Sequence, residues 1–252
     1  MKKNITIIVI LFIVLCLIVF AAYQLFSAKT LTKSQNNIQT TLVASEKNLG
    51  ETGKYFEIKA LYPLFDDQAI DQAIETFIQN QVAEFKKNAE LNKNYPPVAE
   101  SDAKFAFNVA YNYFLSDKIL SIKLEVYQYT GGAHGNTLVK TFNFSLADKK
   151  DLGLKDIFAS DHDYLKIISD DLIASLKQTL TKDGFNDDDW LNQGAGPKAE
   201  NLSTFVFTPS GLTFIFQPYQ DAPYAAGILE STLPYSKINE LVLSPYQNLT
   251  FN

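Results

Sequence analysis

Two adjacent runs of alternating apolar and polar residues constrain the fold most strongly. Residues 104–115 and 119–130 each repeat with a period of two, which is the period of a β-strand. The short polar link between them, 116–118, favours an antiparallel hairpin. The faces that share this alternation consist of Phe105, Phe107, Val109, Tyr111 and Tyr113 in the first run, and Ile122, Leu124, Val126 and Gln128 in the second.

Other segments also have the pattern of strands. Residues 138–146 predict a third strand, with Phe142 and Phe144 on one face. Residues 204–208 and 212–217 flank the turn sequence 209–211, which is typical of a hairpin. Residues 55–62 predict a strand that Pro63 ends.

Two segments have apolar residues at the three- and four-residue spacing of a helix with one buried face. They predict helices over residues 67–91 and 161–181. Residues 236–242 predict a short final helix, and 183–198 is the least regular segment. Strands grouped together, without regular β-α-β alternation, indicate an α+β fold with an antiparallel sheet packed against two main helices.

The N-terminal region predicts a membrane anchor. Residues 5–26 are almost entirely apolar, and about 20 such residues span a bilayer as a helix. We expect a cytoplasmic stub (1–4), a transmembrane signal anchor (5–26) and a tether (27–41), so that the C-terminal part lies outside the cell membrane. A strand–helix section (42–98) and a larger domain (99–252) follow, and the sequence leaves open whether they share a sheet. A cleaved signal peptide ending at 19–21 is the alternative.

Composition argues against several classes of function. The single cysteine, Cys16, lies in the apolar run, so the expected outer region has no disulfide and no thiol nucleophile. The chain contains no arginine and has a net charge of -6, which disfavours nucleic acid and phosphate-clamping enzymes. The only histidines, His134 and His162, are far apart and lack the spacing of a zinc site. We therefore expect no metal or cofactor.

The glycine-rich sequence 131–137 is the first candidate binding site. Glycines allow a ligand to approach the backbone closely, and His134 can form hydrogen bonds. The alternative is a tight turn whose histidine bonds to neighbouring backbone groups. The candidate ligand-binding residues in this tip are Gly131, Gly132, His134 and Asn136.

Three aromatic residues extend the candidate site. Trp190 lies in a polar segment and is suited either to stacking on a ligand or to plugging the core. Tyr219 and Tyr224 flank residues 220–223 and are suited either to lining a groove with the glycine tip or to bonding local backbone groups. No catalytic motif is present, because Ser210 lies in a turn sequence and not in the Gly-x-Ser-x-Gly elbow of hydrolases.

Several segments, in order, resemble a known family of bacterial extracytoplasmic domains. They are GGAHGNT, FNFSL, DLGLKDIF, FVFTPSGLTFIFQPYQDAPYAAG and LPYSKI, with YFEIKALYPLF upstream. This family occurs in lysozyme-responsive anti-sigma factors of the RsiV type and beside the catalytic domain of PdaC-type peptidoglycan deacetylases. The resemblance implies an α+β domain outside the cytoplasmic membrane, which binds lysozyme in RsiV-type proteins.

Two departures limit what the resemblance implies. Only residues 1–4 precede the apolar run, too few to hold a sigma factor, and no deacetylase domain is recognisable. We therefore expect a non-catalytic, membrane-anchored sensor or binding module whose partner is a lysozyme-like protein or a peptidoglycan fragment. An envelope hydrolase using acidic residues and a structural partner of another membrane protein remain alternatives.

Overall fold

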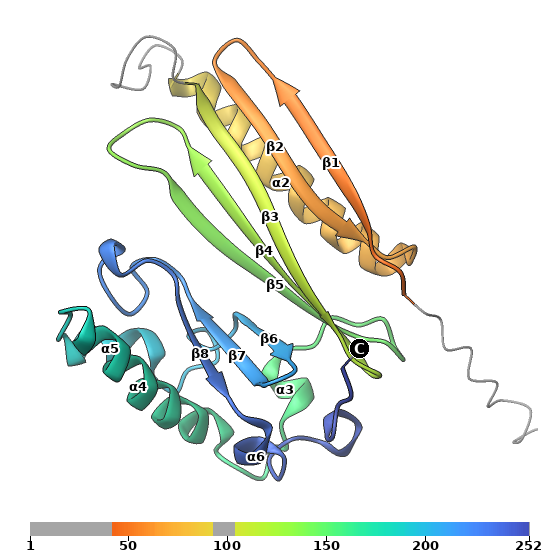
Figure 1. Cartoon of the computed structure of the whole chain (residues 1–252), viewed down its shortest axis with the longest axis vertical. Helices are drawn as coiled ribbons and strands as arrows, with labels where there is room; N and C mark the ends of the chain where they lie inside the picture. Colours follow the sequence, from red (N-terminus) through yellow and green to blue (C-terminus); the bar gives the residue numbers. More distant parts are fainter. Residues whose placement is uncertain (1–41, 93–103, 252) are drawn as a thin grey trace, which may run out of the picture. The chain divides into compact units, whose positions relative to one another are not determined.

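The computed structural model describes residues 42–92 and 104–251, which form a mixed α+β fold with two sheets (Figure 1). The first sheet and its helix comprise β1 (Ser45–Thr52), β2 (Phe56–Leu64), α2 (Gln68–Asn92), β3 (Phe105–Leu115), β4 (Ile119–Tyr129) and β5 (Asn136–Ser145). The remainder comprises α3 (Leu154–Ile157), α4 (Tyr164–Lys182), α5 (Asp188–Ala195), β6 (Phe205–Thr208), β7 (Gly211–Phe216), η1 (Tyr224–Ala226), β8 (Leu229–Leu233), α6 (Tyr235–Ile238) and η2 (Ser244–Tyr246).

The five-stranded sheet has the order β1-β2-β3-β4-β5. Its neighbouring strands are antiparallel except for β2 and β3, which are parallel from Phe56↔Phe105 to Ala60↔Val109. The prediction of an antiparallel sheet is therefore wrong at this pair. The reason is that α2 carries the chain back along the sheet between the two strands, as a β-α-β crossover requires. The 42–98 section thus shares one sheet with the segment that follows.

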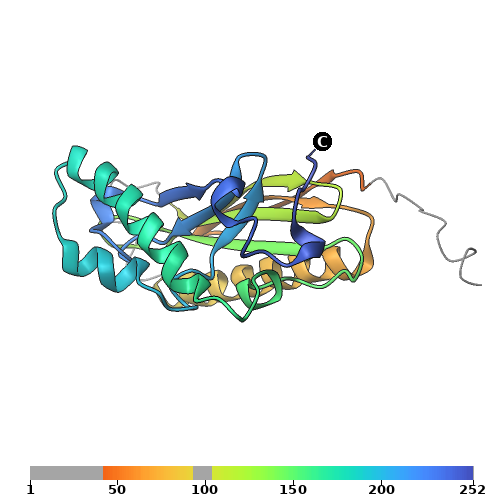
Figure 2. The same cartoon turned by 90° about the horizontal axis from the view of Figure 1, so that it is seen from below.

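Helix α2 covers one face of this sheet, as Figures 1 and 2 show. The predicted helix is confirmed, and its buried face contains Ile70, Ile74, Ile78, Val82 and Phe85. Ring contacts fix it against the strands: the Phe85 and Phe107 centroids lie 5.4 Å apart, and those of Phe77 and Phe142 lie 6.2 Å apart. These contacts come from the apolar spacing that identified the helix in the sequence.

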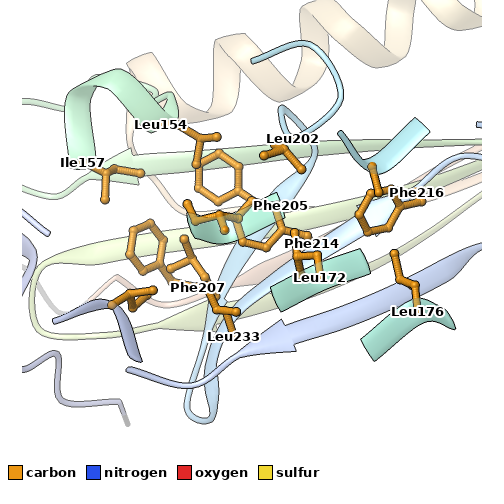
Figure 3. Packing of buried hydrophobic residues seen from close by; sticks show 14 of the residues in the cluster. Leu154, Ile157, Leu172, Leu176, Leu202, Phe205, Phe207, Phe214, Phe216 and Leu233 are labelled. Atoms are coloured by element: carbon orange, nitrogen blue, oxygen red, sulfur yellow. The ribbon is translucent and has the colours of Figure 1, made fainter. Parts of the chain in front are cut away.

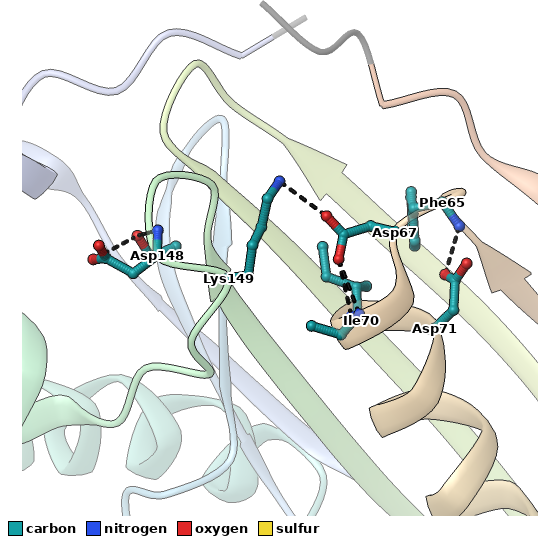
Figure 4. Close-up of polar contacts among 8 residues, drawn as sticks. Phe65, Asp67, Ile70, Asp71, Asp148 and Lys149 are labelled. Atoms are coloured by element: carbon teal, nitrogen blue, oxygen red, sulfur yellow. Dashed lines mark hydrogen bonds and ion pairs between the residues drawn. The ribbon is translucent and has the colours of Figure 1, made fainter. Parts of the chain in front are cut away.

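Carboxylates hold the N-terminus of α2 (Figure 4). The Asp67 carboxylate accepts hydrogen bonds from the backbone N–H groups of Ala69 (3.1 Å) and Ile70 (3.3 Å), and Asp71 accepts one from Phe65 (2.7 Å). Lys149, in the turn after β5, reaches Asp67 at 3.2 Å. Partial burial opposes ionisation of Asp67, but the Ile70 N–H and the Lys149 ammonium outweigh it and lower the Asp67 pKa.

We expect Asp67→Ala to destabilise the protein by about 1–2 kcal/mol, because it removes a helix cap and an ion pair together. Since the folded-state pKa is lowered, this contribution is present above the unfolded pKa of about 4 and disappears as the pH falls through the folded value. Urea unfolding at pH 7 and at pH 3 measures both effects. Equal losses at the two pH values would contradict the assigned role.

The three-stranded sheet, in the order β6-β7-β8, carries the main hydrophobic core (Figure 3). Phe205, Phe207, Phe214 and Phe216 share its core face, and Leu172 and Leu176 of α4 belong to the same cluster. The other face presents Val206 and Ile215, which pack with Val139 of β5. The three-stranded sheet therefore has α4 on one side and the five-stranded sheet on the other.

A buried polar bridge joins the two sheets. The Asn143 side chain of β5 donates to the Phe205 carbonyl (2.9 Å) and accepts from the Ser121 hydroxyl (2.6 Å). Ser121 of β4 in turn accepts from the Phe207 backbone N–H (3.0 Å). Among the described residues β6 pairs with β7 alone, so these two side chains satisfy backbone groups on its other edge.

Several boundaries differ from the sequence prediction. Strand β2 continues through Pro63 to Leu64, because its pairing with β3 ends at Ala60 and no N–H is needed there. Residues 188–195 form helix α5, although the sequence predicted an irregular segment. The Asp187 carboxylate caps it by accepting from the Trp190 N–H (2.9 Å), and Leu191 is buried.

The predicted transmembrane segment, 5–26, lies outside the described residues. Within 42–92 and 104–251, no helix is both long and apolar enough to cross a membrane.

Candidate functional site

The glycine-rich tip is the connection between β4 and β5. Gly131 and Gly132 have φ values of 103° and 95°, a conformation that favours glycine. The Tyr129 hydroxyl donates to the Gly132 carbonyl at 3.1 Å. The turn holds His134 at the surface.

The ring of His134 stacks on that of Tyr224. Their centroids lie 3.9 Å apart with an interplanar angle of 18°. Both side chains donate to the Gly135 carbonyl, from His134 Nδ1 (2.8 Å) and from the Tyr224 hydroxyl (2.8 Å). Because a carbonyl can only accept, Nδ1 of His134 carries the proton in this hydrogen bond.

Tyr219 and Trp190 lie next to this pair of rings. The Tyr219 ring lies 5.4 Å from that of Tyr224, and the Trp190 indole N–H donates to the Tyr219 carbonyl at 3.2 Å. Tyr219 has a φ of 69°, which is unusual for a residue other than glycine, and its surface is 54% exposed. We call His134, Tyr224, Tyr219 and Trp190 the aromatic cluster.

The structure therefore brings together most of the residues that the sequence singled out. Gly131 and Gly132 form the turn that carries His134. Tyr219, Tyr224 and Trp190 come from segments later in the sequence and lie near His134 in the structure. Asn136 is the exception, because it begins β5 and pairs with Gln128 in the sheet. Their role in ligand binding stays a prediction.

Neutral side chains fix the loop that carries both tyrosines, residues 217–227. The Gln217 amide accepts from the Val139 N–H (2.9 Å) and donates to the Val139 carbonyl (2.8 Å), as a neighbouring strand would. The Gln220 amide donates to the carbonyls of Gly194 and Asn201, both at 2.9 Å. The sequence did not predict these roles, since a glutamine in a loop has no pattern that marks it as an anchor.

Asp221 lies at the centre of this loop and is only 2% exposed. Its Oδ2 atom is buried and has no hydrogen-bond partner in the described structure. Burial raises the Asp221 pKa to about 6, and only a hydrogen bond from its own backbone opposes the rise. Sequence reasoning missed this residue because an aspartate between Gln and Ala-Pro reads as part of an exposed turn.

The aromatic cluster offers ring surfaces and neutral hydrogen-bonding groups, a combination suited to binding. In the described part of the chain, no group of three or more His, Cys, Asp or Glu side chains is placed to hold a metal ion. A separate open depression lies on the five-stranded sheet, away from the aromatic cluster. It is lined by Glu46, Leu61, Ala110, Tyr111, Asn112 and Tyr113.

Comparison with known proteins places these elements in a family context. Residues 49–137 match the family model described as Deacetylase PdaC, and residues 155–236 match that of a protein of unknown function, DUF3298. The predicted resemblance to the PdaC-type domains is confirmed. The chain is 29% identical over 194 residues to the peptidoglycan-N-acetylmuramic acid deacetylase PdaC of Bacillus subtilis, which is 77% of this chain and 40% of that protein.

A second group of curated relatives carries the name immunogenic protein. Immunogenic protein MPT64 of Mycobacterium tuberculosis is 28% identical over 123 residues, which is 48% of this chain and 51% of that protein. The chain thus spans about half or less of the length of these curated relatives. The resemblance to RsiV-type proteins stays a prediction.

Two crystal structures of DUF3298 family proteins share the fold. The one from Pseudomonas aeruginosa has a TM-score of 0.58 at 17% identity and covers 82% of this chain and 96% of its own. The one from Bacteroides fragilis has a TM-score of 0.53 at 20% identity, with coverage of 81% and 94%. The mixed α+β fold is therefore shared with these proteins.

Proposed function

We propose that this chain is a non-catalytic binding module of the bacterial cell envelope, and that its aromatic cluster binds a glycan fragment of peptidoglycan. The cluster carries the proposal: four ring side chains from three separate segments converge, and Tyr219 is largely exposed. Aromatic rings with polar handles suit a ligand that is apolar on its faces and polar at its edges, as a sugar ring is. The name of the Bacillus subtilis relative, a peptidoglycan deacetylase, supports the same class of ligand.

The proposed location is outside the cytoplasmic membrane, with residues 5–26 as a single-pass anchor. The apolar run supports this, because its length matches a bilayer span. Peptidoglycan lies on that side of the membrane, so the ligand and the location agree.

We expect Tyr219→Ala to weaken binding of a soluble peptidoglycan fragment, such as a disaccharide–peptide, about tenfold, because it removes an exposed ring of the cluster. Calorimetry on the full chain measures the affinity. Tyr55→Ala is a matched control, since Tyr55 is also exposed but lies immediately before β2. Equal affinities for Tyr219→Ala and the unmodified chain would rule out the cluster as the site.

A lysozyme-like protein is the second candidate ligand, and a specific observation favours it. Asp187, Asp188 and Asp189 lie beside Trp190 and are exposed, and the whole chain has a net charge of -6. Such a surface attracts a basic protein with a strong dependence on salt. Lysozyme affinity that is unchanged between low and high salt would count against this candidate.

A further inference from the structure

We propose that Asp221 is a proton-operated latch for the aromatic cluster: its neutral carboxyl permits the 217–227 loop to dock, and its ionisation releases the loop. This inference concerns the regulation of the proposed binding site and rests on the proposed function only for its effect on ligand affinity. The latch itself follows from where Asp221 lies and from what surrounds it.

The loop has one carboxyl, and one of its two oxygens is buried without a hydrogen-bond partner in the described structure. Asp221 is 2% exposed, and its Oδ2 has no hydrogen bond in the described structure. A buried carboxylate without a partner is costly, whereas the neutral acid is tolerated. The loop's other anchors, Gln217, Gln220 and Tyr224, are neutral hydrogen-bonding groups, so Asp221 is the part of the loop that responds to pH.

The loop is packed closely against α5 on the side of Asp221. A Cβ added to Gly194 would lie 2.1 Å from the Gln220 carbonyl oxygen and 2.7 Å from Asp221 Cα. The loop backbone therefore packs directly against α5 beside Asp221, and the Asp221 Oδ2 atom is buried. Undocking the loop would expose the carboxyl and would also separate Tyr219 and Tyr224 from Trp190 and His134.

Within the described part of the chain, no charged neighbour shifts the pKa of Asp221. Burial raises its pKa from 3.8 to about 6, and the only opposing influence is a backbone hydrogen bond. Titratable side chains on the loop and on the segments near it include Tyr219 and Tyr224 in the loop, His134 in the tip, Lys140 in β5, Lys177 in α4, Asp187, Asp188 and Asp189 at α5, and Lys198 and Glu200 after it. Lys177 pairs with Asp188.

The direction of the effect follows from linkage. The docked loop binds the proton more tightly than the undocked loop, so docking is strongest at acidic pH. It weakens as the pH rises from about 4 to about 6 and is constant above that range. Each unit of pKa difference is a factor of ten, so the docking equilibrium falls about 100-fold across this range.

Hydrogen exchange on the full chain tests the latch. After correction for intrinsic rates, we expect the protection of amides in 217–227 to fall about 100-fold between pH 4 and pH 6.5, while amides in β3 stay constant. Asp221→Asn, which has the same shape and cannot ionise, should show no such fall. The same pH dependence in this variant, or a parallel fall in β3, would overturn the proposal.

Two further measurements remove the remaining ambiguities. Histidines also titrate near this range, so His134→Gln should retain the pH-dependent protection; its loss would assign the effect to His134 instead. Carbon NMR of the unmodified chain should give an Asp221 carboxyl midpoint near 6, and a midpoint near 4 would overturn the latch without any variant.

Ligand binding separates this proposal from the proposed function. If the latch and the proposed function are both correct, a peptidoglycan fragment binds more tightly at pH 4.5 than at pH 7, and Asp221→Asn removes the difference. Absence of binding at any pH, with the exchange result intact, would contradict the proposed function and leave the latch standing. Binding that does not change with pH would contradict the latch.

Discussion

Asn143→Ala should destabilise the protein by about 3 kcal/mol, one of the two largest effects that we expect. Asn143 is 2% exposed and connects the sheets through the Phe205 carbonyl and the Ser121 hydroxyl. Its removal leaves two buried polar groups unpaired and creates a cavity, and each unpaired group costs about 1–3 kcal/mol. Urea unfolding followed by circular dichroism measures the loss.

An exposed asparagine on the same sheet provides the control. Asn108 of β3 faces solvent, so Asn108→Ala should change the free energy of unfolding by less than about 0.5 kcal/mol. If both variants lost the same free energy of unfolding, the Asn143 bridge between the sheets would contribute no more to stability than an exposed asparagine does.

The second large effect is expected for Gly194→Ala, which should lower the free energy of unfolding by about 2–4 kcal/mol. Alanine in a helix is ordinarily more stable than glycine by about 1 kcal/mol. Here the added Cβ would lie 2.1 Å from the Gln220 carbonyl oxygen, so the backbone of the loop or of α5 has to move. Because Trp190 is the only tryptophan, its fluorescence reports whether the loop has moved away from α5.

Gln193→Ala is the matched control for this variant. Gln193 precedes Gly194 in α5 and its side chain is exposed, so the substitution should leave stability and fluorescence nearly unchanged. A Gly194→Ala protein as stable as the unmodified chain would show that the close approach at this position is not required.

The sequence predicts the elements with strong periodicity and misses those defined by tertiary contacts. Helix α2 and strands β3 and β4 repeat apolar residues over more than ten positions, and all three are confirmed. Strand β1 (SEKNLGET) is polar and exposed on nearly every residue, so its pairing with β2 leaves no pattern in the sequence. The parallel β2–β3 pair was missed because strand direction depends on the path of α2.

In the candidate site, too, the sequence identifies some residues but misses the contacts that bring them together. Glycine and aromatic residues stand out by type, so the sequence could mark His134, Trp190, Tyr219 and Tyr224. Their convergence depends on Gln217 and Gln220, whose amides act on the backbone of distant segments. The burial of Asp221 depends on a close approach by Gly194, which no local pattern reveals.

The parallel pairing of β2 with β3 has a consequence for the order of assembly during synthesis. One edge of β2 pairs with β1, but its other edge has no partner until residues 105–109 have been made, because α2 intervenes. By contrast, β3, β4 and β5 are consecutive hairpins that close over short distances along the chain. Folding should therefore begin in this three-stranded meander, and the earlier-made β1–β2–α2 section should join it afterwards as a late-docking unit.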